Sequence, residues 1–588
     1  MSDALTKRRR WLAHPRTLWA AVVLGIVCML VSIDTGLSAD DFLLKYGFLG
    51  GTELPWAPLV GSGLPGPGDT TQVVAARDLG LLPWTASTDF SFAFLRPLSL
   101  LTHRIDFALW PDQPWLMHLH SVAWFGLFLA AAAAFIRRVE GPTWVAGLAV
   151  VILALDDAHG PTIGWIANRN LVMAAAFGFS ALLAHDRAAR DGGSRWFAPV
   201  LFVLALASNE GALGLLPLWL GYTLWCDRRP ERWRDLAAVS GLGLAWLGLW
   251  IGLGFGVHNS GVYADIGADP VGSILQLLTN FPVLATSLSI GMWSELFSFA
   301  DEDVRAIWVV TAWVIFVATL IVGIRLARRD PRTAMWLLGA LGALLPVTAS
   351  FPSDRLLLMA SVPGAVLLAK FVQHLRDDRR AWRLAAVVAT AVLVRHVGLN
   401  LVLSPLRART MEAPQDLVDR STTSLDLDQA AGHIVVLINP PSDAMAAYGL
   451  VLQSVQHAAL PDAIHSLYSG LEAVTVERVN TTTLRITPDG PWMAHASERL
   501  SRNPATQPFS VGDTVRAPGV TYHIDAVTPD GRPAGIHVVF DAPLEDPRYQ
   551  FHAWDVIDFR PFPIPSVGDA SQLPATDGAA AYFGVAPE

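Results

Sequence analysis

The sequence predicts an α-helical polytopic membrane protein, with about eleven transmembrane helices and a soluble C-terminal α+β or β-rich domain. The first observation is composition: 52% of the 588 residues are hydrophobic and only 16% are charged. An ordinary soluble domain carries about 25% charged residues, so this deficit indicates a bilayer. The second observation is that apolar runs of near-membrane length recur as far as residue 403 and then stop. We therefore expect a transmembrane domain over residues 1–404 and a soluble domain over residues 405–588.

The N-terminus combines a basic cluster with an apolar run. Lys7–Arg10 is followed by apolar residues from about Leu18 to Ile33. A basic start before an apolar run is also typical of a signal peptide. However, no small-x-small cleavage site follows, and an Asp-containing sequence comes next. We interpret the run as an uncleaved first transmembrane helix.

The apolar runs set the number of helices. A spanning helix needs roughly 17–25 residues, and several runs are shorter, so their boundaries are approximate. The eleven runs lie at about 18–34, 116–136, 142–156, 169–185, 196–208, 211–226, 234–256, 307–325, 334–350, 355–374 and 382–403.

The links between these runs alternate in charge. The links rich in Lys and Arg are Lys7–Arg16, Arg137-Arg138, Arg187–Arg195, Arg228–Arg234, Arg325–Arg332 and Lys370–Arg383. The links poor in Lys and Arg are 37–115, 157–168, the turn at Asn209, 257–306 and 351–354. The positive-inside rule assigns the basic set to the cytoplasm. We therefore predict a multi-pass protein of the cytoplasmic (inner) membrane, with a cytoplasmic N-terminus and an extracytoplasmic C-terminal domain.

One apolar run breaks this alternation. Residues 271–292 contain Asn280-Phe281-Pro282 and are followed by the acidic stretch Glu295–Asp303. If this run crossed the membrane, Arg325–Arg332 would fall on the outer side. We therefore expect a re-entrant or interfacial helix at the outer face.

Beyond Pro405 the pattern is that of a globular domain. Short β-branched or aromatic runs are separated by turns such as Pro-Asp-Gly and Val-Gly-Asp. The expected strands are His433–Asn439, Val474–Val479, Thr482–Ile486, Thr514–Ala517, Thr521–Val527, Ile536–Asp541 and Tyr549–Trp554. Residues 442–472 look helical. A domain of roughly 180 residues is long enough to bury its own core.

Charge and cysteine content argue against two classes of protein. We find no basic patch interleaved with aromatic residues, so no nucleic-acid partner is expected. The two cysteines, Cys28 and Cys226, lie in an apolar helix or at a helix end. A disulfide framework or a thiolate-bound metal is therefore not expected.

Polar residues gather on the predicted outer side of the helices. Ionisable groups at membrane depth are costly, so their presence indicates function by default. The residues concerned are Asp40, Asp41, Arg96, His103, Asp156, Asp157, His159, Arg169, Glu210, Asp354 and Arg355. The inner links carry only the Arg-rich orientation signal. This one-sided distribution is typical of an active site at the boundary between water and lipid.

These residue types suit group transfer from a phosphate-linked lipid. A carboxylate at a helix end can take a proton from a hydroxyl, and general-base catalysis of this kind contributes about 10²–10⁴-fold. Arginines bind phosphate oxygens through bidentate hydrogen bonds. The adjacent carboxylates Asp40 and Asp41 could also hold a divalent cation, although two carboxylates are too few to establish a metal site. No other cofactor is expected.

Several segments resemble the GT-C glycosyltransferases. Asp40-Asp41-Phe42 resembles the acidic loop motif of that superfamily. RPLSLLTHRIDFALW (Arg96–Trp110), followed by His118, is similar to the RPL…LDYxLWG…H segment of one branch, which includes the bacterial family-39-like enzymes and the tetratricopeptide-containing O-mannosyltransferases. Three later segments that resemble this branch are Asp156–Leu183, Ala207–Leu220 and Ser353–Ala369. The matches keep the family's order and cover about residues 17–375, which leaves the C-terminal domain outside.

The resemblance implies a fold with long outer loops and a polyprenyl-phosphate sugar as the donor. It also implies that Asp40 or Asp41 activates or orients the acceptor, and that displacement inverts the anomeric carbon. The acceptor would be a protein, a glycan or a lipid. The residues expected to bind substrate, the donor phosphate included, or to line the cavity are Arg96, His103, Asp156, Asp157, His159, Arg169, Glu210 and Arg355.

The chain departs from the family pattern at several polar positions. Gly160 replaces a proline, Thr162-Ile163-Gly164 stands where the family has an acid, Asn209 replaces a lysine, and Leu356 replaces a tyrosine. A non-catalytic GT-C-like scaffold is therefore one alternative. A transporter or flippase of a lipid-linked substrate is another, although the sequence shows no inverted repeat and no paired broken helices.

The candidate residues also have structural interpretations. Arg96 and Arg169 could anchor to lipid headgroups. Asp156-Asp157 could cap a helix, and Glu210 could form a buried ion pair. Arg395-His396, inside the last apolar run, is interpreted as a snorkelling position or a contact between helices.

Overall fold

The computed structural model describes residues 11–49, 69–300, 302–377, 382–426, 430–456, 459–495 and 497–583. The basic cluster Lys7–Arg10 lies outside the described residues. The chain forms two compact units, and each is discontinuous in sequence. The helical unit comprises residues 1–36, 95–253 and 274–411, and the α/β unit comprises residues 37–94, 254–273 and 412–588. Segments 37–94 and 254–273 therefore fold with the C-terminal region, although they lie far from it in sequence.

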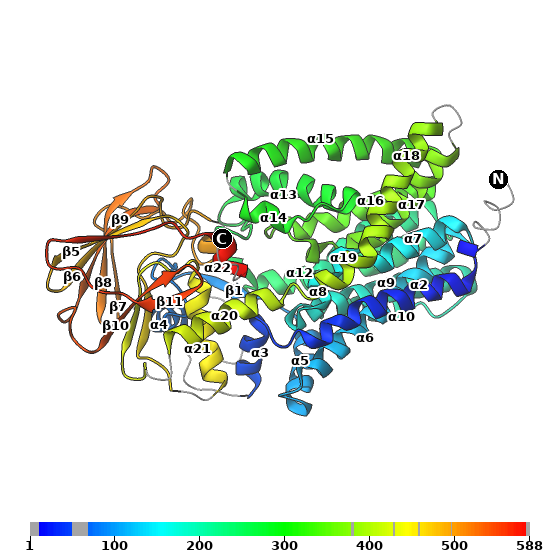
Figure 1. Cartoon of the computed structure of the whole chain (residues 1–588). Coiled ribbons are helices and arrows are strands. Elements are labelled where there is room, and N and C mark those ends of the chain that lie inside the picture. Colours follow the sequence, from blue (N-terminus) through cyan, green and yellow to red (C-terminus); the bar gives the residue numbers. More distant parts are fainter. Residues whose placement is uncertain are drawn as a thin grey trace. The chain divides into compact units, whose positions relative to one another are not determined.

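The helical unit contains all the predicted apolar runs as helices (Figure 1). Its longer helices are α2 (Pro15–Met29), α5 (Pro97–Leu109), α6 (Pro114–Glu140), α7 (Trp144–Leu155), α9 (Arg169–Asp191), α10 (Phe197–Leu206), α11 (Leu216–Trp225), α12 (Arg232–Gly252), α13 (Pro270–Ile290), α15 (Glu302–Ala327), α16 (Pro331–Val347), α17 (Leu358–Asp377), α18 (Trp382–Leu393) and α19 (Asn400–Arg407). Among the described residues, nine helical segments are long and apolar enough to cross a membrane. The predicted multi-pass fold, with a β-rich C-terminal domain, is confirmed.

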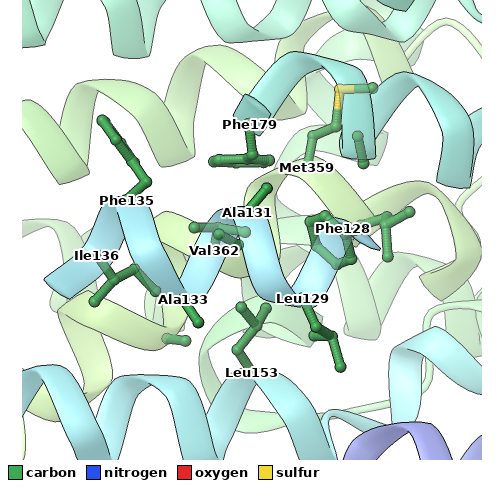
Figure 2. Packing of buried hydrophobic residues seen from close by; sticks show 14 of the residues in the cluster. Phe128, Leu129, Ala131, Ala133, Phe135, Ile136, Leu153, Phe179, Met359 and Val362 are labelled. Carbon is green, nitrogen blue, oxygen red and sulfur yellow. The ribbon is translucent and has the colours of Figure 1, made fainter. Parts of the chain in front are cut away.

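The core of the helical unit is packed around α6. Figure 2 shows Phe128 and Phe135 of α6 among side chains from neighbouring helices. Those neighbours include Leu153 of α7, Phe179 of α9 and Val362 of α17. Since α6 is covered on several sides, its sequence is apolar around most of its circumference rather than along one stripe.

Glycines bring two of these helices into backbone contact. A Cβ built on Gly25 of α2 would lie 2.5 Å from the carbonyl oxygen of Ala154 in α7. A Cβ on Gly147 of α7 would lie 1.9 Å from the carbonyl oxygen of Leu12. Small residues at such positions allow close packing of helices in a membrane, where apolar burial alone does not drive association.

The basic links meet at one end of the helical unit. Arg138 pairs with Asp186, which precedes the link 187–195. Lys370 pairs with Glu140 at 2.8 Å and with Asp330 at 2.5 Å. These contacts join links that are up to 230 residues apart in sequence, and the charge pattern assigns all of them to the same side.

Helix α13 corresponds to the run that broke the charge alternation. It is a continuous helix of 21 residues and is one of the nine segments with the length of a span. Asn280 donates to the carbonyl oxygens of Thr348 and Ser350 at 3.1 and 2.8 Å, and Ser287 donates to Asp354 at 2.6 Å. Its buried polar residues therefore pack on the segment that follows α16, which the charge pattern places on the outer side. The interfacial orientation of α13 stays a prediction.

Three sheets are present among the described residues of the α/β unit. The six-stranded antiparallel sheet has the order β12 (Ala570–Leu573), β5 (Val474–Asn480), β6 (Thr483–Pro488), β9 (Pro533–Phe540), β8 (Val520–Val527) and β7 (Thr514–Ala517). The four-stranded mixed sheet has the order β11 (Asp558–Pro561), β10 (Tyr549–Asp555), β3 (Ile434–Leu437) and β4 (Ala463–Ser466). The two-stranded sheet pairs β1 (Ser91–Ala93) with β2 (Gly256–His258). All seven predicted strands are present.

The same unit also contains the helices α3 (Asp40–Leu49), α4 (Thr70–Leu79), α20 (Glu412–Leu425) and α21 (Asp443–Val455). The prediction of helix over residues 442–472 is correct only as far as Val455 and wrong beyond it. Residues Ala463–Ser466 instead form β4, which pairs in parallel with β3 in register Val435 to Ile464. Helix α21 is thus the crossover of a β3–α21–β4 unit, which parallel strands require.

The grouping of basic links predicts which sites are accessible on each side of the membrane. We expect a cysteine at Ser566→Cys, on the surface of the α/β unit, to react with an impermeant maleimide added to intact cells. A cysteine at Ser194→Cys, exposed in a basic link, should react only after permeabilisation. Both variants would be made in a background with Cys28 and Cys226 replaced. Labelling with the opposite sidedness would contradict the predicted orientation.

Candidate functional site

Those parts of the links poor in Lys and Arg that belong to the helical unit meet at its other end. We call this region the polar end and define it as residues 95–118, 156–170, 207–212, 287–299, 348–357 and 394–407. Its polar side chains form several hydrogen-bonded groups, each of which joins two or more helices.

The largest group surrounds Asp157, in the 3-10 turn after α7. Asp157 is 3% exposed and accepts from Arg395 at 3.2 Å and from the Trp293 indole at 2.8 Å. Arg395 lies in a π-helical turn, Val394–Leu399. Its guanidinium also donates to the backbone carbonyl of Gly291 and to the side-chain oxygen of Asn400. Turns of this type are frequent at functional sites.

Arg407 connects this group to two further carboxylates. Its guanidinium pairs with Asp354 at 2.5 Å and with Glu295 at 3.0 Å, and it lies 3.6 Å from Asp157. Asp354 also accepts from Ser287 and from the hydroxyl and amide of Ser294. Burial, together with the charge of Asp354, raises the pKa of the Glu295 carboxyl.

A small cavity, about 10 Å³, lies beside this group. That volume accommodates about one water molecule. Asp156, Asp157, Asp354, Arg395 and His396 contribute to its lining. Asp156 is also the N-cap of the 3-10 turn, because its carboxylate accepts from the amide of Ala158 at 3.2 Å. The capping interpretation therefore holds for Asp156, whereas Asp157 takes part in ion pairs.

Arg169 forms the second group, where α5, α6 and α9 meet. Its side chain is fully buried and forms an ion pair with Asp106, which is also fully buried. It also donates to Ser121 at 2.9 Å and to the carbonyl of Met117 at 2.8 Å. Arg169 therefore forms a structural ion pair and does not anchor to headgroups.

His103 lies in the same region and is 2% exposed. Neither of its ring nitrogens has a hydrogen-bond partner among the described residues. Burial lowers the pKa of His103 well below its usual value, and the charges of Arg169 and His120 lower it further. The ring is therefore neutral at physiological pH.

Two more groups tie separate loops together. Arg96 pairs with Glu210 through two hydrogen bonds, which is the bidentate geometry of a strong pair. Burial opposes ionisation of Glu210, but the Arg96 guanidinium outweighs it and lowers the pKa of that carboxyl. Asn209 donates to Asn170 at 2.7 Å. Asn209, which stands where the GT-C enzymes that the sequence resembles have a lysine, thus forms a contact between two side-chain amides.

Two predicted site residues, His159 and Arg355, do not belong to any ion pair in the described chain. His159 is buried against Phe125 and Phe128, and Nε2 lies 3.0 Å from the carbonyl oxygen of Leu153. The Arg355 guanidinium lies 5.0 Å from the centre of the Trp165 ring and 5.3 Å from that of Phe351. Arg355 is only half-buried, so its charge is held in a fixed position and is not neutralised by a carboxylate.

Asp40 and Asp41 belong to the α/β unit, in the first turn of α3. Asp41 is fully buried, and its Oδ2 accepts from the backbone amide of Ser38 at 3.0 Å. Asp40 is half-buried, and its Oδ1 accepts from the hydroxyl of Tyr448 in α21 at 2.6 Å. A hydrogen bond donated to a carboxylate favours its charged form.

Several residues of the polar end were not predicted from the sequence. Asp106, Glu295 and Arg407 are principal members of the ion-pair groups, and Arg395 was interpreted as a snorkelling position or a helix contact. A usable signal existed for Asp106 and Arg395, because each is a charge within an apolar helical pattern. Glu295 and Arg407 follow apolar runs, where a charge is ordinary.

The described residues contain no group of three His, Cys, Asp or Glu side chains arranged to hold a metal ion. The adjacent carboxylates Asp40 and Asp41 make separate contacts, with Tyr448 and with Ser38.

The sequence matches no family model and no curated protein sequence. Solved structures that are similar over much of the chain include the three described next. An oligosaccharyltransferase of Archaeoglobus fulgidus is 10% identical, with 76% of this chain and 64% of that chain covered and a TM-score of 0.36. ArnT of Cupriavidus metallidurans is 12% identical, with 76% and 90% covered and a TM-score of 0.35. The arabinofuranosyltransferase AftD from mycobacteria is 13% identical, with 92% and 41% covered and a TM-score of 0.33.

This chain thus spans about two thirds of the archaeal oligosaccharyltransferase, most of ArnT and less than half of AftD. At these TM-scores no residue role and no activity is transferred from them to this chain.

The ion pairs of Arg407 predict a large effect of its removal on stability. Arg407→Ala leaves the carboxylates of Asp354, Glu295 and Asp157 without the cation that they share. Removal of one partner of a buried ion pair lowers the free energy of unfolding by about 3–5 kcal/mol. We expect a clear fall in the midpoint of thermal unfolding, measured by tryptophan fluorescence in detergent. Arg104→Ala removes an exposed arginine of α5 and should leave the midpoint unchanged. Equal midpoints for Arg407→Ala and wild type would show that these ion pairs do not stabilise the fold.

Proposed function

We propose that the protein is an integral-membrane glycosyltransferase of the GT-C type, which transfers a sugar from a polyprenyl-phosphate donor at the outer face of the cytoplasmic membrane. One observation carries the proposal: the four family-like segments of the helical unit contact one another directly at the polar end. Arg96 pairs with Glu210, and Arg169 pairs with Asp106. Asn170 and Asn209 share a hydrogen bond, as do Thr162 and the carbonyl of Arg355. Segments chosen only for their likeness to the family thus form one assembly.

Arg355 is the proposed contact for the donor phosphate. The other arginines discussed at the polar end, Arg96, Arg169, Arg395 and Arg407, each pair with a carboxylate. Arg355 instead stacks on Trp165 and Phe351 and keeps its charge available. A planar guanidinium held against aromatic rings is pre-organised for bidentate binding of phosphate oxygens.

Asp40 is the proposed general base. Asp41 is buried and caps the turn at Ser38, whereas Asp40 is half-buried and accepts from the hydroxyl of Tyr448. Asp40 follows Gly36, the last residue of the first helical segment, by only four residues in the sequence. This proximity in the chain supports a role in the same reaction.

The proposed step is a direct displacement. The acceptor oxygen forms a bond to the anomeric carbon while the bond from that carbon to the phosphate oxygen breaks. Asp40 takes the acceptor proton, and the polyprenyl phosphate leaves with the electron pair and carries its charge toward Arg355. Attack from the face opposite the leaving group inverts the anomeric carbon. The acceptor, which can be a protein, a glycan or a lipid, supplies the hydroxyl that attacks.

Replacement of the proposed base tests the reaction. In membranes supplied with radiolabelled polyprenyl-phosphate sugars, we expect Asp40→Asn to lower the transfer rate by about 10²–10⁴-fold. Asp41→Asn keeps an oxygen that can cap Ser38, so it should retain far more activity. Asp34→Asn removes an exposed carboxylate six residues earlier and is the matched control. If wild type transfers no sugar from any donor, the scaffold alternative replaces this proposal.

Replacement of Arg355 tests the donor contact separately. We expect Arg355→Ala to raise KM for the donor by about tenfold or more, because a charge-assisted phosphate contact contributes about 1.5–3 kcal/mol. Arg355→Lys keeps the charge but loses the planar fork, so KM should take an intermediate value. The measurement is transfer as a function of donor concentration, with Arg104→Ala as the control. A change in kcat alone, with KM unaltered, would count against phosphate binding by Arg355.

A further inference from the structure

Helix α21 carries a tyrosine that contacts the proposed base. The hydroxyl of Tyr448 donates to Oδ1 of Asp40 at 2.6 Å. Hydrogen bonds from a hydroxyl to a charged carboxylate are short, about 2.5–2.7 Å, and roughly twice as strong as those between neutral groups. Asp40 lies in a segment that resembles the GT-C enzymes, whereas Tyr448 lies in residues 405–588, outside that resemblance. The contact therefore joins the proposed base to the C-terminal part of the chain.

The ring of Tyr448 is held by the packing of α21 on α3. These two helices lie side by side in the α/β unit (Figure 1). Phe42 and Tyr46 of α3 and Met445 of α21 belong to one buried apolar cluster, and the Tyr448 ring packs against that cluster. A tyrosine side chain has only two rotatable χ angles, so a ring that is fixed by packing also fixes the position of its hydroxyl.

The phenol sets the direction of this hydrogen bond. Burial raises the pKa of Tyr448 well above its usual range, and the charge of Asp40 raises it further. The phenol is therefore protonated at physiological pH, so its hydroxyl donates and the carboxylate accepts. A carboxylate has about four lone-pair sites, and this bond uses one of them, so Asp40 can accept it and still take a proton.

The backbone around Asp40 is fixed as well. The Asp41 carboxylate accepts from the amide of Ser38 at 3.0 Å, and the Asp41 amide donates to the carbonyl of Ser38 at 3.0 Å. Ala39 has a φ of 48°, in the left-handed region that residues other than glycine rarely adopt. Such conformations persist where the surrounding structure over-determines them, and they are frequent at active sites. Asp40 is thus held through both its backbone and its side chain.

We propose that Tyr448 is a positioning residue, which orients the Asp40 carboxylate for removal of the acceptor proton. This inference rests on the proposed function, because Tyr448 acts only through Asp40. It gives the C-terminal domain a part in the reaction, since α21 supplies the hydroxyl that orients the base. A displacement of about 1 Å in a reacting group can lower a rate by about 10²-fold, so a contact of this kind affects catalysis.

A purely structural role for Tyr448 is the alternative. A buried tyrosine hydroxyl usually finds a hydrogen-bond partner, and a backbone carbonyl is sufficient. Tyr549 of β10, in the same unit, has this arrangement, because its hydroxyl donates to the carbonyl of Gly519 at 3.0 Å. Tyr448→Phe and Tyr549→Phe therefore each remove one hydroxyl and one hydrogen bond, but only the first alters the surroundings of Asp40. Tyr549→Phe is the matched control.

The test measures transfer from radiolabelled polyprenyl-phosphate sugars in membranes that contain the full chain. We expect Tyr448→Phe to lower kcat by about tenfold to 10²-fold and to leave KM for the donor unchanged, because the proposed donor contact is Arg355. Tyr549→Phe should transfer sugar as wild type does. The double variant Asp40→Asn/Tyr448→Phe should be no slower than Asp40→Asn alone, since the effects of residues that act as a unit are not additive.

The pH dependence of transfer gives a readout that a structural role does not change. A hydrogen bond donated to a carboxylate favours its charged form, so its loss in Tyr448→Phe should move the acidic limb of the kcat/KM profile to higher pH. Replacement of Tyr448 by 3-fluorotyrosine makes the phenol more acidic and a stronger donor, so the limb should move to lower pH. The other titratable groups around this contact, unchanged in these variants, are Asp41, Lys45 and Tyr46 of α3, and Tyr263.

Several results would overturn the inference. These are a wild-type rate and pH profile in Tyr448→Phe, additive losses in the double variant, or equal losses in Tyr448→Phe and Tyr549→Phe. If Tyr448→Phe does not fold, the 3-fluorotyrosine variant keeps the hydrogen bond, and an unshifted profile there would count against the inference.

The same assay separates this inference from the proposed function. If wild type transfers no sugar, or if Asp40→Asn transfers it as wild type does, the proposed function fails and the role of Tyr448 fails with it. If Asp40→Asn loses transfer while Tyr448→Phe keeps the rate and pH profile of wild type, only the role of Tyr448 is refuted.

Discussion

The helical unit depends on one constraint: a charge buried among transmembrane helices must have a partner. Arg407 satisfies it for Asp354 and Glu295, and Arg395 satisfies it for Asp157. Without these cations the carboxylates would have to be neutralised, because an isolated charge in a medium of low polarity is very costly. Since the partners come from four separate segments, the ion pairs also fix how the ends of those helices meet.

This constraint explains why the polar end can be both rigid and reactive. The arginines that pair with carboxylates position the loops, but their positive charge is already balanced, so they attract an anionic ligand less strongly. Arg355 differs because Trp165 and Phe351 hold its side chain, and aromatic faces do not neutralise a cation as a carboxylate does. Within the α/β unit, Asp41 accepts from the backbone amide of Ser38 at the start of α3, whereas Asp40 is half-buried. At the polar end, the arginines that hold the structure are thus distinct from Arg355, the proposed donor contact.

The sequence predicted the helices and most strands because their signals are local. Apolar runs and β-branched runs such as Thr514–Ala517 identified elements whose bounds the structure reproduces closely. The strand β4, Ala463–Ser466, was mistaken for helix because its sequence, Ala-Ile-His-Ser, does not alternate between apolar and polar residues. Its extended conformation depends on pairing with β3. The partners of Arg169 and Asp157 could not be predicted either. Asp106 lies 63 residues from Arg169, and Arg395 lies 238 from Asp157, so only the folded chain brings them together.

The acids beside the two small cavities, one at the polar end and one at the ends of β3 and β4, differ in the groups that surround them. Beside Asp157, carboxylates alternate with arginines, and hydrogen bonds from Ser287, Ser294 and Trp293 complete the set. Around Glu498 the nearby arginine, Arg499, is turned to backbone carbonyls, and the walls are aromatic. Arginines thus balance the charge of the acids beside Asp157, whereas burial and the charge of Asp443 raise the pKa of Glu498 to about 8 and favour its neutral form.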